Sequence, residues 1–409
     1  MLGPGLVAAM AGDDAAGIAT YSSVGAAYGY DLIWVLLLIT VSLAVVQEMS
    51  ARLGAATGRG MLDLVRERFG ITWALVMVVV VLVANAGVIL AEFVGIGAAT
   101  ELLGVDKRVS IPLSAAVIWY LVTAGSYSRV EKIFVLMTLV FFAYPATAFI
   151  AGPDWGAVGH GAFIPTLRKD ADFILLFVAL VGTTITPYMQ LFQQSSIVEK
   201  GVARRHYGPE RLDAYVGSVF SNFVAVMIIV ATGATLHATG HTSIETAAEA
   251  AEVLRPVAGD AAQMLFAVGL LGASFIAAAV LPLTTAYTMS EAFGFTKGVN
   301  LDFRRARVFY SVFTGLLVFG VVVSLIPGLP VMDLLVAVSA LNGILLPVLL
   351  YFLLRLINDH RLVGDLRNGT VYNVLGWGTL VFVSVAVFAL LASQALGLFG
   401  IELADLLGG

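Results

Sequence analysis

The sequence contains no cysteine among its 409 residues. This absence excludes disulfide bonds, thiolate metal sites and cysteine nucleophiles. Charged residues are also scarce, at 12% of the chain. The longest polar stretch, about residues 200–213, is too short to form a soluble domain. No separate hydrophilic domain is therefore expected beside the apolar segments.

Hydrophobic residues make up 60% of the chain, and the mean hydropathy is +0.97. Soluble domains contain only about 45–50% apolar residues. The composition therefore predicts a polytopic membrane protein, with residues 1–409 forming a single transmembrane domain in the lipid bilayer and no nucleic-acid partner. The first segment has no charged leader region, so we expect a retained helix and not a signal peptide.

Apolar windows separated by charged or Gly/Pro-rich connections predict an all-α fold with about eleven transmembrane helices. They cover about residues 2–24, 31–51, 72–101, 109–124, 130–151, 173–198, 214–237, 262–292, 306–326, 332–357 and 371–397.

The distribution of Lys and Arg predicts how these helices are oriented, because positively charged loops are typically cytoplasmic. With a cytoplasmic N-terminus, the outside loops hold only Lys107, Arg108, Arg168, Lys169 and Arg255. All the remaining Lys and Arg residues then lie inside. We therefore expect a multi-pass protein of the plasma membrane with an extracellular C-terminus.

Two adjacent carboxylates, Asp13 and Asp14, lie in the middle of the first apolar segment. Each costs about 2.5–3.5 kcal/mol in lipid unless it faces a cavity or a cation. The flanking Gly12 and Gly17 favour a break in the helix that exposes backbone carbonyls beside the acids. Carboxylates beside bare carbonyls are typical ligands of hard cations. Alternatively, Asp13 simply caps the second half-helix.

A second break is predicted in the sixth span, at residues 182–188. Pro187 removes a backbone donor there. Thr183, Thr184 and Thr186 either point into a cavity or bond only the carbonyls of their own backbone.

The two breaks fall at the first spans of two sets of five, residues 1–151 and 173–357, which leaves 371–397 as an accessory helix. An odd number of spans per set gives the two sets opposite topologies. Breaks at corresponding positions indicate a midplane site in a transporter built from inverted repeats.

A third deep carboxylate, Glu92, lies in the third span, where no intramembrane Lys or Arg is available to pair with it. A metal, a proton or water must compensate these acids, so we predict a cation pathway. Asn342 in the tenth span either contributes its carbonyl oxygen to the same cavity or ties two helices together.

Further motifs accompany the two breaks. They are Gly3-Pro4-Gly5, Gly17-Ile18-Ala19-Thr20 after Asp14, Tyr28-Gly29-Tyr30, Trp34, Leu90-Ala91-Glu92-Phe93 and the stretch that ends in Pro187. In order and spacing this set resembles the Nramp family of divalent metal transporters over nearly the whole chain. The resemblance implies a LeuT-like fold with a 5+5 inverted repeat, in agreement with the topology above.

The chain departs from typical Nramp residues at several positions. Gly17 stands in place of an Asn ligand, Thr186 in place of a Met, Tyr188 and Gln193 in place of two His, and Ile89 in place of an Asp. This pattern resembles the Nramp-related magnesium transporters, which implies transport of Mg²⁺ and Mn²⁺ without proton coupling.

Ligand chemistry agrees with that expectation. A Met sulfur favours softer transition metals, and its loss beside Gly17 leaves a wide, oxygen-lined site suited to a mostly hydrated ion. We expect Asp14 to anchor the ion, with Thr183 and Thr186 as oxygen ligands and Glu92 or Tyr188 in the outer shell. The loss of two His and one Asp argues against proton coupling.

The sequence thus predicts a transporter that imports Mg²⁺, and Mn²⁺ as well, by alternating access, works as a monomer and needs no resident cofactor. One alternative is a proton-coupled Mn²⁺/Fe²⁺ importer with Glu92 and Asp13 as proton groups. Another is a carrier of an organic cation or amino acid, although two acids in the first break repel a substrate carboxylate. An enzyme is not expected, because all five His lie in loops or at span ends: His160, His206, His237, His241 and His360.

Overall fold

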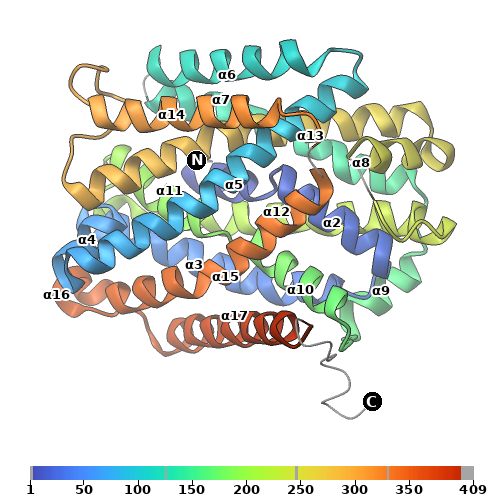
Figure 1. Ribbon diagram of the computed structural model, residues 1–409. Coiled ribbons are helices and arrows are strands. Elements are labelled where there is room, and N and C mark those ends of the chain that lie inside the picture. The colour runs from blue at the N-terminus through green and yellow to red at the C-terminus, as the bar shows by residue number, and fades with distance from the viewer. Residues whose placement is uncertain (1–2, 125–126, 245–246, 329–330, 398–409) are drawn as a thin grey trace.

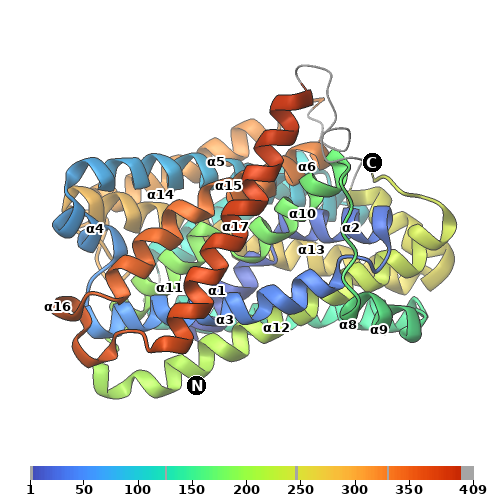
Figure 2. The ribbon, with the colours of Figure 1, turned by 90° about the horizontal axis from the view of Figure 1, so that it is seen from below.

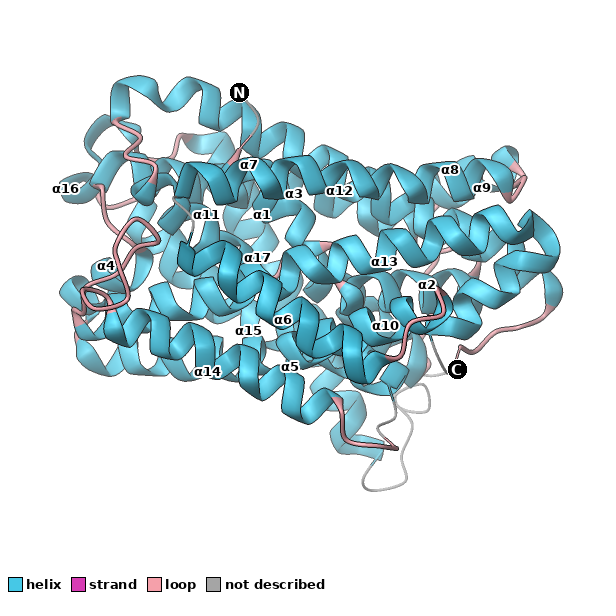
Figure 3. Cartoon of the chain, turned by 90° about the horizontal axis from the view of Figure 1, so that it is seen from above, coloured by secondary structure: helices cyan, strands magenta, loops and turns pink. Residues whose placement is uncertain are grey.

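The computed structural model describes residues 3–124, 127–244, 247–328 and 331–397, and these ranges contain helices and loops without a strand. Most helices run between two ends of the bundle (Figure 1). One end carries α4 and α16, and the other carries α9 (Figures 2 and 3). In chain order the helices are α1 (Pro4–Gly12), α2 (Ala15–Tyr28), α3 (Ile33–Thr57), α4 (Met61–Phe69), α5 (Ile71–Leu102), α6 (Lys107–Ala124), α7 (Tyr127–Met137), α8 (Ala143–Ile150), α9 (Trp155–Phe163), α10 (Ala171–Thr184), α11 (Pro187–Glu199), α12 (Tyr207–Thr235), α13 (Ala247–Phe293), α14 (Arg307–Ser324), α15 (Val331–Ile357), α16 (His360–Val363) and α17 (Thr370–Gly397).

Nine helical segments in the described ranges are long and apolar enough to cross a membrane. They correspond to nine of the predicted spans. The predicted first span is split into α1 and α2, of 9 and 14 residues. The predicted fourth span is α6, whose mean hydropathy is lowered by Lys107 and Arg108 at its start.

Three short helices were not anticipated, α4, α9 and α16, and all of them lie in predicted loops. In α4, Asp63 occupies the first turn and Arg66 and Arg68 occupy the last turn, which suits the helix dipole. The turn between α3 and α4 begins at Gly58, whose φ of 64° is a left-handed conformation that glycine adopts without strain. The end with α4 and α16 is the one that the basic loops predict to be cytoplasmic.

Both predicted breaks are confirmed. The first separates α1 from α2 at Asp13 and Asp14, and the second separates α10 from α11 at Ile185 and Thr186. The capping role considered for Asp13 is wrong, because Asp14 is the N-cap of α2 and accepts a hydrogen bond from Gly17 N.

The broken helices form the centre of the bundle. Every residue of α1 is buried, and α1 packs on α11 and α12. α2 packs on α12, α10 and α15. α10 and α15 approach closely at Gly182 and Gly343, where a Cβ atom on Gly182 would lie 2.3 Å from Gly343 N. By contrast, α17 lies at the edge of the bundle (Figures 1 and 2).

The start of α1 is held by a single carboxylate from α12. Asp213, which is 2% exposed, accepts backbone hydrogen bonds from Gly3, Gly5 and Leu6 at 2.9, 2.6 and 3.3 Å. The first N–H groups of a helix have no partner within the helix, so this contact satisfies donors that would otherwise be buried unpaired. Asp213 therefore fixes the position of α1 and of the break that follows it.

Replacement of Asp213 by Asn is expected to loosen α1. A Val7→Cys variant supplies a single thiol on buried α1, because the sequence has no cysteine. Adding Asp213→Asn should speed maleimide labelling of that thiol about 2- to 30-fold, since loss of a helix cap costs about 0.5–2 kcal/mol. Glu210→Gln, one turn earlier on α12, is the matched control. Equal labelling rates in the two backgrounds would contradict the assigned role.

Candidate cation site

Asp14 lies at the first break with both carboxylate oxygens engaged. Its Oδ1 accepts from Gly17 N at 2.7 Å, and its Oδ2 accepts from the Tyr188 hydroxyl at 2.9 Å. The same hydroxyl lies 2.6 Å from the carbonyl oxygen of Ala11. A carboxylate oxygen has two acceptor positions, so each oxygen of Asp14 retains one for a cation or for its water.

Glu92 of α5 reaches the same break. Its Oε2 accepts from Ala15 N at 3.1 Å, whereas its Oε1 is buried without a hydrogen-bond partner. Glu92 and Asp14 therefore both face the positive N-terminal end of α2, which favours negative charge. No Lys or Arg in the described ranges forms an ion pair with either of them.

Asp13 is also fully buried. Its Oδ1 lies 3.3 Å from the donating hydroxyl of Tyr21, and its Oδ2 has no partner. Asp13 thus adds a third carboxylate beside the break without capping the helix.

The two breaks meet next to Gly17. A Cβ atom at that position would lie 3.0 Å from the Gly12 carbonyl oxygen, 3.0 Å from Thr183 Oγ1 and 3.3 Å from Asp14 Oδ1. Oxygens of both broken helices therefore converge around the α-carbon of a residue that has no side chain. A methyl group at this position would press against all three oxygens, so the absence of a side chain at Gly17 lets them converge.

Two further predicted ligands are buried with an unpartnered oxygen. Thr186 is the N-cap of α11, and its Oγ1 has no hydrogen-bond partner. The Oδ1 of Asn342 on α15 also has none. One turn before Asn342, Ser339 donates to the carbonyl of Ala16 at 3.3 Å and accepts from Thr20 at 3.0 Å, so this part of α15 lies against the first break.

The other two positions singled out by the sequence, Gln193 and Ile89, lie in different surroundings. Gln193 is buried on α11, and both polar atoms of its amide lack partners. Ile89 packs toward α14, because a Cβ on Gly320 would lie 2.8 Å from its Cγ2. Ile89 therefore lies on a helix contact and adds no group to the converging oxygens.

A polar seam between α3 and α11 was not predicted from the sequence. It is formed by Gln47, Ser50, Gln190 and Gln194, whose spacing places each pair on one helix face. The two helices meet at Gly54 of α3, where a Cβ atom would lie 3.3 Å from Gln194 Cγ. All four side chains carry buried polar atoms without partners. Such groups cost about 1–3 kcal/mol each unless water bonds them. The glutamines that follow Pro187 are the feature of the sequence that could have indicated this seam.

A cavity of about 890 Å³ lies between α2, α10 and α15, on the side of the breaks opposite to the seam of α3 and α11. Asp172 and Asp333 line it together with apolar residues that include Ala340 and Ile344. This cavity reaches the α15 turns next to Ser339 and Asn342. It lies toward the end of the bundle that the basic loops predict to be extracellular.

Within the described ranges no three His, Cys, Asp or Glu side chains are arranged to hold a metal ion. The converging groups are instead carboxylate, carbonyl and hydroxyl oxygens. Such a set suits a hard cation that keeps part of its water shell, because water completes the coordination that the protein leaves open.

Residues 5–393 match the family model described as natural resistance-associated macrophage protein-like, Nramp. Among solved structures, a manganese transporter of Eremococcus coleocola superimposes with a TM-score of 0.79 at 17% identity, covering 99% of this chain and 89% of that one. MhsT in complex with L-phenylalanine gives a TM-score of 0.63 at 13% identity, covering 95% and 97%. Mhp1, a nucleobase-cation-symport-1 family transporter, gives 0.60 at 17%, covering 96% and 91%. These likenesses confirm the predicted LeuT-like fold.

Gly17→Ala is expected to weaken divalent-cation binding about tenfold or more. The added methyl would enter the space between the three converging oxygens, and overpacking of this kind costs about 1–3 kcal/mol. Titration calorimetry with Mn²⁺ measures the change. Gly315→Ala is the matched control, because a Cβ there meets no atom within 4 Å. Unchanged affinity in Gly17→Ala would place the cation elsewhere.

Proposed function

Because the chain belongs to the Nramp family, we propose that it imports Mg²⁺ and Mn²⁺ by alternating access without proton coupling. The family is one of membrane transporters of divalent metal ions and not of enzymes. The observation that carries the proposal is the convergence of the Gly12 carbonyl, Thr183 Oγ1 and Asp14 Oδ1 beside Gly17. These three oxygens surround the position that a side chain at residue 17 would occupy.

Asp14 anchors the ion, either directly or through a water. Thr183 and Thr186 supply neutral oxygens, and Glu92 holds the start of α2 and adds negative charge. Because the Asp14 oxygens already accept from Gly17 and Tyr188, only part of their capacity is free. Mg²⁺ gives up water reluctantly and is commonly bound by one or two carboxylates plus several waters, which this arrangement can provide.

The ion enters through the cavity between α2, α10 and α15 and leaves along the seam between α3 and α11. The seam connects the level of the second break with the predicted cytoplasmic end, and its unpartnered amides can replace waters of the outer shell. An inside-negative potential contributes about 2.3 kcal/mol per charge per 100 mV, and a divalent ion gains about twice that. Import therefore proceeds without a proton gradient.

The test of coupling is uptake into sealed proteoliposomes that contain both a Mg²⁺-sensitive and a pH-sensitive dye. Mg²⁺ should enter without acidification of the lumen, because Tyr188 and Gln193 stand where titratable His side chains would be needed. Acidification that accompanies metal entry would overturn the uncoupled mechanism.

Asp14→Asn is expected to lower Mg²⁺ and Mn²⁺ uptake by about 10- to 100-fold, since an interaction with a charged group contributes about 1.5–3 kcal/mol. Proteoliposome uptake measures the loss. Glu67→Gln makes the same acid-to-amide change at a side chain that is 52% exposed and paired with Arg59 at the α4 end, and it should transport normally. Normal transport by Asp14→Asn would show that Asp14 does not anchor the ion.

Thr186→Met is expected to lower the ratio of Mg²⁺ to Mn²⁺ uptake about tenfold or more, because a thioether suits softer metals and does not replace an oxygen ligand of Mg²⁺. Thr186→Val removes the hydroxyl without adding sulfur and separates the two effects. If both variants keep the ratio of the unmodified protein, Thr186 does not select the ion.

One observation favours a greater share of Mn²⁺. The thioether of Met189 borders the first break, since a Cβ on Gly12 would lie 2.7 Å from its sulfur. The family resemblance also keeps a proton-coupled Mn²⁺/Fe²⁺ importer as the alternative. Selective loss of Mn²⁺ uptake in Met189→Leu, together with luminal acidification in the dye experiment, would favour that alternative.

A further inference from the structure

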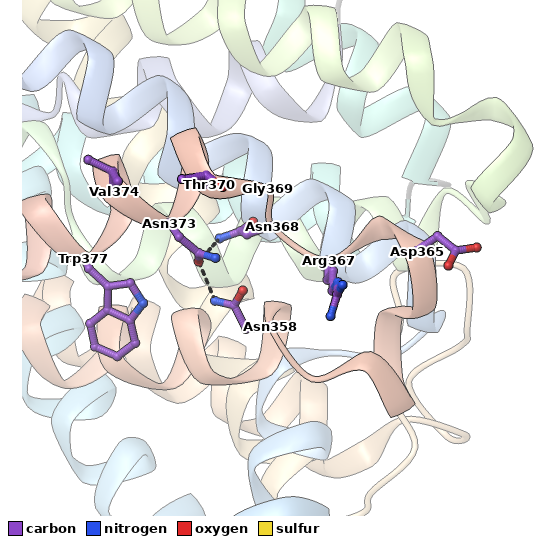
Figure 4. Close-up of a pocket in the computed structure, with 9 residues that line it drawn as sticks. All are labelled: Asn358, Asp365, Arg367, Asn368, Gly369, Thr370, Asn373, Val374 and Trp377. Carbon is purple, nitrogen blue, oxygen red and sulfur yellow. Dashed lines mark hydrogen bonds between the residues drawn. The ribbon is translucent and has the colours of Figure 1, made fainter.

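A second cavity, of about 810 Å³, lies at the predicted cytoplasmic end where α15 ends and α17 begins. Figure 4 shows its polar wall, in which Asn358, in the turn after α15, and Asn373 of α17 lie on one side and Arg367 on the other. The cavity is separate from the broken helices and plays no part in the proposed ion pathway.

The cavity wall presents hydrogen-bond donors. The Oδ1 of Asn373 accepts from Asn358 and Asn368 at 2.8 and 3.2 Å, which fixes the amide and leaves its NH₂ group free to donate. Asn368, only 6% exposed, is held in turn by the guanidinium of Arg52. The donor wall is therefore a built and hydrogen-bonded structure.

Positive charge accompanies these donors. The side chain of Arg367 is exposed and has no ion pair within the described ranges. Arg204 lies nearby, 3.6 Å from where a Cβ on Gly364 would be, and is likewise unpaired there. The 28-residue helix α17 also starts at this cavity with Thr370, and its first N–H groups have no partner within the helix. The carboxylate of Asp365 points away from the asparagines (Figure 4).

An apolar strip continues from the cavity along α17. Val371, Val374 and Trp377 are 67%, 66% and 37% exposed. They recur at three-residue spacing on a helix that lies at the edge of the bundle (Figure 2). Trp is typical of the boundary between head groups and acyl chains. The cavity thus has a donor-rich, cationic part joined to a lipid-facing apolar part.

We propose that this cavity binds the head group of an anionic phospholipid from the cytoplasmic leaflet. The phosphate accepts from Arg367, from the Asn373 amide and from the first N–H groups of α17, and the acyl chains lie along Val371, Val374 and Trp377. Basic pockets between transmembrane helices on the cytoplasmic side are suited to such head groups. The adjoining apolar strip distinguishes a lipid from a free phosphate ion.

The test uses the full-length protein in detergent, with phosphatidylglycerol added and bound lipid counted by native mass spectrometry. Phosphatidylcholine and inorganic phosphate are the comparison probes, the latter followed by thermal shift. Arg367→Gln should weaken phosphatidylglycerol binding about tenfold. Arg361→Gln removes another exposed charge from the same end, outside the cavity. It should change binding about twofold or less, because salt screens an exposed charge that does not contact the head group.

Equal losses in the two variants would show diffuse surface attraction and overturn the site. Equal retention of phosphatidylcholine would overturn the preference for an anionic head group. A thermal shift with inorganic phosphate as large as that with phosphatidylglycerol would assign the cavity to a free anion. The apolar contact has its own test, since Val374→Ser should lower phosphatidylglycerol binding and leave any phosphate effect unchanged. None of these measurements depends on metal transport.

Discussion

The energetic cost of burying carboxylates in the centre of a membrane protein is the constraint on which the rest of this structure depends. Asp13, Asp14 and Glu92 have no basic partner in the described part of the chain, so other groups must offset their charge. The interruption of the first helix does so in part, because it frees the N–H groups of Ala15 and Gly17 to donate to Glu92 and Asp14. The break and the acids therefore require each other.

The second break brings further polar groups to the carboxylates at the first break. A continuous helix in place of α10 and α11 would pair its own carbonyl and N–H groups with each other. The interruption before Pro187 instead brings Thr183 and Tyr188, from either side of the break, to the surroundings of Asp14. The small residue at Gly17 then leaves a space among oxygens of both helices. A cation in that space would supply the positive charge that the protein itself does not provide.

The surroundings of the site differ between its two ends. Toward the predicted outside, a cavity lies against α2, α10 and α15. Toward the predicted cytoplasm, Asp213 holds the start of α1, and the polar seam of α3 and α11 is buried. Unpartnered amides make that seam a poor permanent contact, because hydration competes with packing there. The contrast between a fixed cap and a hydratable seam suits the alternating access proposed above.

Much of this fold follows from the sequence, because hydropathy and helix-breaking residues are local signals. Long apolar windows predicted the spans, and Asp13-Asp14 and Thr186-Pro187 predicted the two breaks, since lipid tolerates neither free backbone groups nor lone charges. Local signals do not report partners. The sequence could not decide which acid caps α2, that Asp213 reaches α1 across more than two hundred residues, or that the polar face of α3 packs on α11. Those contacts depend on how distant helices pack, and only the tertiary structure decided them.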